Sequence, residues 1–168
     1  MKSRDTLTII ALPTLIAVVL MAAAVQAVQV EGVSMSPTLP HGRTMLVNRA
    51  AYGLRLPVIN RYLTTWHTPR NGDIIVYNTP DDDSIVVKRL VAGPGERFQL
   101  LGRRMLVGDS EYKLSTYSYA QLQQFARIPD GMVFTAGENA ARSRDSRHYG
   151  LVPIESIRGR VLITPFGP

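Results

Sequence analysis

Short apolar and β-branched runs, separated by turn residues, follow one another along most of this chain. The runs cover residues 45–47, 74–77, 85–87, 98–101, 105–107, 132–134 and 159–163. Between them lie turn formers such as Pro-His-Gly at 40–42, Asn-Gly-Asp at 71–73, Gly-Pro-Gly at 93–95 and Pro-Asp-Gly at 129–131. Short strands with turns at this density predict a mainly β fold, an antiparallel sheet or barrel-like domain.

Two local features refine this prediction. Residues 101–105, Leu-Gly-Arg-Arg-Met, have the composition of a hairpin turn, and residues 119–125 can form a short helix. The stretch from about 99 to 130 is the most polar part of the chain. We expect it to form a small β-rich insertion lobe.

The N-terminal part has a different pattern, because no charged residue occurs from Leu7 to Val30. A helix that crosses a bilayer needs about 20 apolar residues, and Lys2 and Arg4 before the run favour a cytoplasmic N-terminus. The pattern predicts a cytoplasmic tail at 1–6, a transmembrane anchor at 7–28 and an extracytoplasmic domain at 29–168. The alternative is a cleavable signal peptide ending near Ala27, although its usual apolar core is only about 7–15 residues long.

Charge and composition restrict the partners. The net charge is +6, and the arginines are scattered without runs or interleaved aromatics, so a lipid surface explains the basic balance better than nucleic acid does. The absence of cysteine excludes disulfides and thiol nucleophiles. The three histidines lack metal-ligand spacing, and the aspartates at 81–83 read as a solvated turn. We therefore expect no metal and no cofactor.

Lys88 is the most informative single residue. The chain contains three lysines and sixteen arginines, and only Lys88 ends an apolar run, Ser-Ile-Val-Val-Lys at 84–88. A desolvated lysine can lose its proton and act as a general base, whereas arginine cannot. The alternative is a lysine at a strand end whose amine reaches out to water.

Four blocks then resemble the type I signal peptidases of bacteria, which are Ser/Lys-dyad serine proteases. They are Val-Glu-Gly-Val-Ser-Met-Ser-Pro-Thr-Leu at 30–39, Asn-Gly-Asp-Ile-Ile-Val-Tyr at 71–77, Val-Lys-Arg-Leu-Val-Ala-Gly-Pro-Gly-Glu at 87–96, and the stretch from Gly to Pro at 137–153. The blocks occur in the family's order after an apolar N-terminal run. Each block alone is weak, but the four together are specific.

The resemblance implies a role for each matching residue. Ser34 corresponds to the nucleophile and its backbone N–H to one oxyanion donor, while Lys88 corresponds to the general base. Ser143 corresponds to a hydroxyl that orients the lysine amine, and Asp145 and Arg147 to a structural ion pair. The residues that would line apolar pockets for small side chains, one and three positions before the cut, are Val30, Met35, Leu39, Val76 and Val87.

The chain departs from the family pattern in two places. Gly32 stands two residues before the nucleophile, where some relatives have a serine that serves as a second oxyanion donor. Ala140 and Ala141 replace the arginine and aspartate with which the last block of the family usually opens. The first departure leaves the second oxyanion donor open, and the second predicts a looser loop before Ser143.

The implied function is a membrane-anchored serine endopeptidase that removes signal peptides from exported preproteins. It would lie in the bacterial cytoplasmic membrane as a single-pass protein, with its catalytic domain on the outer face. Its partners would be signal peptides and the lipid bilayer, and neither nucleic acid nor metal. The alternatives are a dedicated processing peptidase of a conjugation or pilus system with the same dyad, or a non-catalytic, membrane-tethered β-domain that binds extended peptides.

Overall fold

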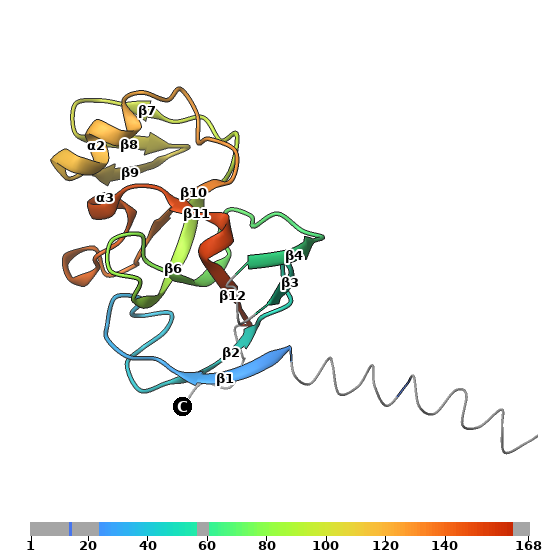
Figure 1. Ribbon diagram of the computed structural model, residues 1–168. Coiled ribbons are helices and arrows are strands. Elements are labelled where there is room, and N and C mark those ends of the chain that lie inside the picture. The colour runs from blue at the N-terminus through green and yellow to red at the C-terminus, as the bar shows by residue number, and fades with distance from the viewer. Residues whose placement is uncertain (1–13, 15–23, 57–60, 163–168) are drawn as a thin grey trace, which may run out of the picture.

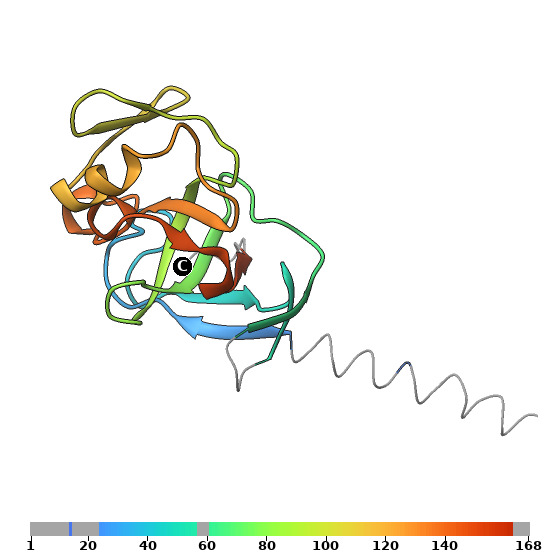
Figure 2. The same ribbon diagram turned by 45° about the horizontal axis from the view of Figure 1, so that its top comes forward.

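The computed structural model describes residues 14, 24–56 and 61–162, and its main element is a seven-stranded antiparallel sheet (Figure 1). The strand order is β1-β2-β12-β5-β6-β10-β11. The strands are β1 (Val25–Gln29), β2 (Thr44–Asn48), β5 (Ile74–Asn78), β6 (Ile85–Ala92), β10 (Met132–Ala136), β11 (Val152–Pro153) and β12 (Ile157–Leu162). The sheet curls into a half-barrel (Figures 1 and 2), which confirms the prediction of a mainly β, antiparallel fold.

Strand β5 shows why this sheet has two apolar faces. All five of its residues are buried, and successive side chains of a strand point to opposite faces. Ile74 and Val76 join one apolar cluster with Met35 and Leu39, whereas Ile75 and Tyr77 join a second cluster. We call the face that carries Val76 the inner face, because the segment that holds Ser34 packs against it.

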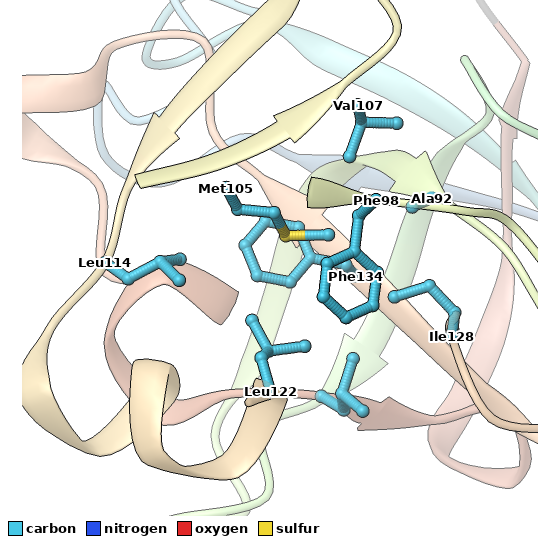
Figure 3. Close-up of a cluster of buried hydrophobic side chains, with 9 residues drawn as sticks. Ala92, Phe98, Met105, Val107, Leu114, Leu122, Ile128 and Phe134 are labelled. Atoms are coloured by element: carbon cyan, nitrogen blue, oxygen red, sulfur yellow. The ribbon is translucent and has the colours of Figure 1, made fainter. Parts of the chain in front are cut away.

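A separate lobe is inserted between β6 and β10. It consists of a three-stranded sheet, β7 (Gln99–Leu100), β8 (Arg104–Val107) and β9 (Ser110–Lys113), followed by helix α2 (Thr116–Leu122). Apolar side chains of the lobe, among them Met105 and Leu122, pack against Phe134 of β10 (Figure 3). This shared core attaches the lobe to the main sheet.

Local predictions in the lobe have mixed outcomes. The hairpin at 101–105 is confirmed, because β7 and β8 pair across it and Gly102 adopts a φ of 56°. The predicted helix was placed three residues too late. Ser115 accepts a hydrogen bond from the N–H of Ser118 at 3.1 Å and so begins α2 at Thr116.

Short elements complete the chain. They are the hairpin of β3 (Gly53–Leu56) and β4 (Arg61–Thr65), the 3-10 turns η1 (Ala140–Arg142) and η2 (Ile154–Ser156), and helix α3 (Ser146–Tyr149). The β3–β4 region presents Leu54, Leu63 and Trp66 to solvent, each about half exposed or more. Tryptophan is a residue type that favours a membrane–water interface.

The N-terminal prediction is only partly covered by the structure. Most of the expected anchor at 7–28 lies outside the described residues, and none of the helices in residues 14, 24–56 and 61–162 is long and apolar enough to cross a bilayer. The expected end of the anchor needs correction, because Val25–Gln29 forms strand β1, paired with β2. Uncharged residues fit an edge strand as well as a helix, so hydropathy alone could not place this boundary.

Candidate active site

Ser34 and Lys88 lie 54 positions apart in the sequence, and the fold brings their side chains together. Ser34 belongs to the turn after β1, and Lys88 is the fourth residue of β6. The Lys88 Nζ donates to Ser34 Oγ at 2.8 Å and to the Val87 carbonyl at 3.0 Å. This distance allows direct proton transfer between the two side chains.

The surroundings of Lys88 favour its neutral form. The side chain is buried, with a relative exposure of 4%. Burial lowers the pKa of Lys88, the charge of Asp145 partly opposes this, and the charge of Arg147 lowers the pKa further. An amine of this kind has a lone pair that can accept the proton of the Ser34 hydroxyl.

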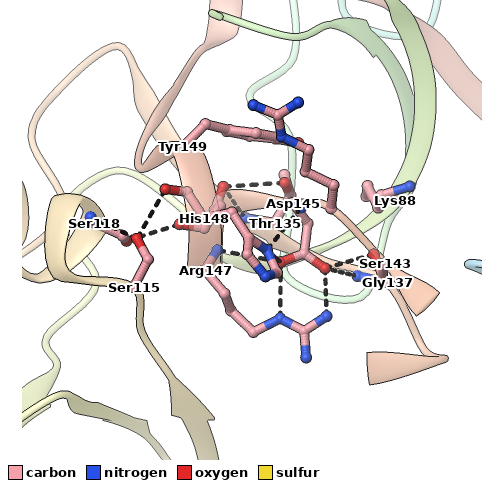
Figure 4. A network of polar contacts seen from close by, with 12 residues as sticks. Lys88, Ser115, Ser118, Thr135, Gly137, Ser143, Asp145, Arg147, His148 and Tyr149 are labelled. Carbon is pink, nitrogen blue, oxygen red and sulfur yellow. Dashed lines mark hydrogen bonds and ion pairs between the residues drawn. The ribbon is translucent and has the colours of Figure 1, made fainter. Parts of the chain in front are cut away.

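Asp145 is the centre of a buried polar network beside this pair (Figure 4). Its Oδ2 accepts the Gly137 N–H at 2.8 Å and the Ser143 hydroxyl at 2.6 Å, and its Oδ1 accepts Arg147 Nε at 2.8 Å. Burial alone would raise the pKa of Asp145, but the hydrogen bonds from Arg147, Gly137 and Ser143 outweigh it and the pKa is lowered. The carboxylate is therefore ionised and fixes the segment from Gly137 to Arg147.

The hydroxyl of Ser143 makes a different contact from the expected one. The resemblance implies that its hydroxyl orients the lysine amine, whereas here the hydroxyl donates to Asp145. Because the Ser143 hydroxyl donates its hydrogen bond to Asp145, the lone pairs of Ser143 Oγ remain free to accept one. An orienting contact with Lys88 thus stays a prediction, with Asp145 setting the direction of the hydroxyl.

A second set of contacts, which sequence reasoning missed, holds the Ser34 turn in place. The N–H of Asn139 donates to the Ser34 carbonyl at 3.0 Å, and the N–H of Thr38 donates to Glu138 Oε2 at 3.3 Å. Glu138 also pairs with Arg89, the neighbour of Lys88 on β6. The sequence signal that could have pointed to these contacts was Arg89, a charged residue directly after Lys88.

These contacts bear on the loop before Ser143, where Ala140 and Ala141 predicted looseness. The segment forms the 3-10 turn η1 instead. Arg144, directly after Ser143, pairs with Asp81 at 2.6 Å. Within the turn the N–H of Arg142 donates to the Asn139 carbonyl at 3.0 Å, and the largely exposed Arg144–Asp81 pair adds little stability. A looser loop thus stays a prediction.

Gly137 lies between the Ser34 turn and Ser143, with no room for a side chain. A Cβ at this position would lie 2.2 Å from Ser143 Oγ and 2.7 Å from the Ser34 carbonyl oxygen. We expect Gly137→Ala to displace the Ser34 turn and to lower kcat by about 100-fold, the cost of a misplacement of about 1 Å. Kinetics of purified variants measure this.

Gly93→Ala is the matched control for Gly137→Ala, because a Cβ at Gly93 would meet no atom closer than 3.6 Å. It should retain its activity. Equal activity of Gly137→Ala and Gly93→Ala would show that the packing around Gly137 does not position Ser34.

The bend before Ser34 has its own support. Gly32 adopts a φ of 85°, a left-handed conformation that favours glycine, and its N–H donates to His41 Nδ1 at 3.0 Å. His41 thus stabilises the bend. Because this N–H is already paired and glycine has no side-chain donor, Gly32 offers no second oxyanion donor in this arrangement.

The five predicted pocket residues lie together on the inner face. Four belong to one buried cluster and the fifth packs against its edge: Val30, Met35, Leu39, Val76 and Val87. These side chains are therefore part of the hydrophobic core, and the four buried members have relative exposures of 2–7%. In the described parts of the chain, no group of three His, Asp or Glu side chains is placed to hold a metal ion.

Together, the hydroxyl, the buried amine and the ionised carboxylate form a site with the groups that acyl transfer by a serine nucleophile requires. A family model described as "Signal peptidase, peptidase S26" matches residues 3–166. The chain belongs to this family.

Individual relatives agree with this family. Signal peptidase I of Pseudomonas fluorescens is 29% identical over 187 residues, covering 86% of this chain and 66% of its own length. Signal peptidase I of Bacillus caldolyticus is 30% identical over 148 residues, covering 79% and 74%. A crystal structure of a signal peptidase I from Enterococcus faecalis V583 is 25% identical, with a TM-score of 0.42, and covers 57% of this chain and 98% of that chain. The chain thus spans just under two thirds of the length of the Pseudomonas relative.

Proposed function

We propose that this protein is a serine endopeptidase of the signal peptidase I type that cleaves signal peptides from exported preproteins. The observation that carries the proposal is the 2.8 Å contact between Ser34 Oγ and the buried Lys88 amine. Membership of the family and its named relatives supports the substrate class. The reaction uses only side chains of the chain itself and water.

The chemistry follows from the positions of the two groups. The neutral Lys88 amine takes the proton of the Ser34 hydroxyl as its oxygen attacks the scissile carbonyl. The resulting ammonium returns the proton to the leaving amine when the peptide bond breaks, which leaves an acyl-enzyme on Ser34. The same amine then takes a proton from water as the water oxygen attacks the acyl carbon, and it returns this proton to Ser34 Oγ when the ester bond breaks, which releases the signal peptide and restores the serine.

Selection of the cleavage site would depend on the inner face. A peptide in extended form pairs with strand backbone and places alternate side chains on one side. The cluster around Met35 and Val76 offers it shallow apolar contacts suited to small residues one and three positions before the cut. The apolar run at 7–28 and the exposed side chains of the β3–β4 region would place the site at the outer surface of the bacterial cytoplasmic membrane.

The test uses the full chain in detergent with a preprotein that has alanine one and three positions before its cleavage site. We expect a single cut after the alanine and its loss in Ser34→Ala. Ser36→Ala, a neighbouring half-buried serine, is the matched control and should remain active. Cleavage by Ser34→Ala at the wild-type rate would contradict the proposal, and binding without cleavage by the wild type would favour a peptide-binding β-domain.

A further inference from the structure

A cavity of about 390 Å³ opens on the inner face of the main sheet. It extends from the apolar cluster that contains the five predicted pocket residues, because Val76 belongs to both. The residues that line it are Gln26, Val28, Val47, Arg49, Arg55, Val76, Ile85 and Arg158. Three of these described residues are arginines and none is acidic.

The arginines are close enough to influence one another. Burial lowers the pKa of Arg55, and the positive charges of Arg158 and Arg49 lower it further, whereas Tyr62 and the negative charge of Asp83 oppose this. Arg158 is anchored through its Nε to Asn78. Like charges gathered beside an apolar wall repel one another and lose hydration, so an anion that entered the cavity would offset both costs.

The position of the cavity relates it to the proposed cleavage reaction. Ile85, at its rim, lies three residues before Lys88 on β6, a distance of about 10 Å at the usual rise of a strand. A peptide that runs along β6 with its scissile bond at Ser34 therefore reaches Ile85 with about its fourth residue from the cut. Val76, which lines the cavity, pairs with Val87 of β6. The cavity wall therefore continues into the predicted pockets.

Two kinds of anion fit a wall of valines and guanidinium groups, a peptide carboxylate and a lipid phosphate. The end of the apolar N-terminal run lies near the cavity, since the Arg49 N–H donates to the Ala24 carbonyl at 2.7 Å. Two observations favour the peptide: Val76 belongs to both the cavity and the predicted pockets, and a peptide that runs along β6 reaches the cavity at Ile85. Arg pairs well with carboxylates because its planar fork can donate two parallel hydrogen bonds.

We propose that the cavity binds an acidic side chain of the substrate, carried four to six residues before the cut. This inference rests on the proposed function and adds a substrate preference to it. The arginines then act in recognition and touch no reacting atom. Preproteins with a carboxylate in this window are the preferred substrates, which makes the set of substrates narrower than small residues near the cut alone would allow.

The experiment measures kcat/KM of the full chain on a preprotein series. Residues four, five and six before the cut are glutamine in the parent and are changed singly to glutamate, with alanine kept one and three positions before the cut. We expect glutamate at one or two of these positions to raise kcat/KM about tenfold, mainly through KM, the size of one partly exposed charge-assisted contact. The gain should shrink as salt is raised.

Variants of the cavity separate this effect from the reaction itself. In Arg49→Gln/Arg158→Gln the preference for glutamate should disappear, while the glutamine parent is cleaved at the wild-type rate. Arg127→Gln, an exposed arginine of the insertion lobe, should keep the preference. Thermal unfolding should change little in the double variant, because the relief of charge repulsion on Arg55 offsets the lost hydrogen bond of Arg158 to Asn78.

The outcomes distinguish the two proposals. Equal cleavage of glutamate and glutamine substrates by the wild type overturns the inference and leaves the peptidase function intact. The inference is also overturned if the preference for glutamate survives in the double variant, or if glutamates placed after the cut raise kcat/KM in the same way. Loss of binding to vesicles with anionic phospholipid in the double variant, without any peptide preference in the wild type, overturns it in favour of a lipid headgroup. Absence of all cleavage contradicts the proposed function first.

Discussion

Lys88→Arg is expected to lower kcat by on the order of 10³-fold or more, the contribution of a general base in covalent catalysis. A guanidinium stays protonated at any pH the fold survives, so it cannot accept the Ser34 proton. Lys88→Met, which has a similar length and no charge, should be equally inactive. It should unfold at the same temperature as the wild type or higher, because a buried amine no longer has to be desolvated. The measurements are preprotein cleavage and thermal unfolding.

The pH profile adds an independent readout. Since the pKa of Lys88 is lowered, kcat/KM should rise with pH through this pKa and reach a plateau below the ordinary titration range of lysine. The unfolded chain binds more protons at Lys88 than the folded one between the two pKa values. Stability from this residue therefore increases with pH in that window, and Lys88→Met should lose the increase. Activity of Lys88→Met that equals the wild type would indicate a lysine whose amine only reaches toward water.

Asp145→Asn is expected to cost about 3–5 kcal/mol of unfolding free energy, because it leaves the Arg147 charge buried without its partner. Asp145 is fully buried and Arg147 is 8% exposed. Changing both residues, as Asp145→Asn/Arg147→Met, should cost less than the sum of the single changes. Asp109→Asn, an exposed carboxylate of the lobe, is the control and should be neutral. Denaturant unfolding gives each value.

The same carboxylate links stability to acid. Its lowered pKa means that its contribution is complete above the ordinary titration range of aspartate. The contribution is lost as the pH falls through the folded-state pKa, when protonation removes the negative charge that pairs with Arg147. Asp145→Asn should flatten this part of the acid unfolding curve. An unchanged acid midpoint would assign the acid sensitivity to other groups.

The part of this structure that the sequence could predict is the part with local or family-specific signals. Short apolar runs separated by turn residues predicted the antiparallel sheet. The four sequence blocks predicted that Ser34 and Lys88 meet, and they do so at 2.8 Å. Neither residue could be paired with the other from periodicity alone, because the strands β2 to β5 lie between them in the sequence and must be arranged first.

Features that depend on tertiary placement could not be read in advance. Helix α2 begins at Thr116 because the Ser115 side chain caps it there, whereas the sequence pattern placed the start of the helix three residues later. The hydroxyl of Ser143 donates to Asp145, a contact that depends on how the loop folds back and that the sequence spacing does not predict. The three arginines of the inner-face cavity come from the turn after β2, from β3 and from β12, so the spacing of residues 49, 55 and 158 in the sequence does not predict their proximity.

The position of β12 has a consequence for biosynthesis. This strand comes last among the described elements, yet it lies between β2 and β5 and joins the N-terminal pair to the rest of the sheet. Until the residues of β12 have left the ribosome, β1 and β2 lack the strand that pairs with both β2 and β5. The proposed active site would therefore assemble only once β12 is available to complete the sheet.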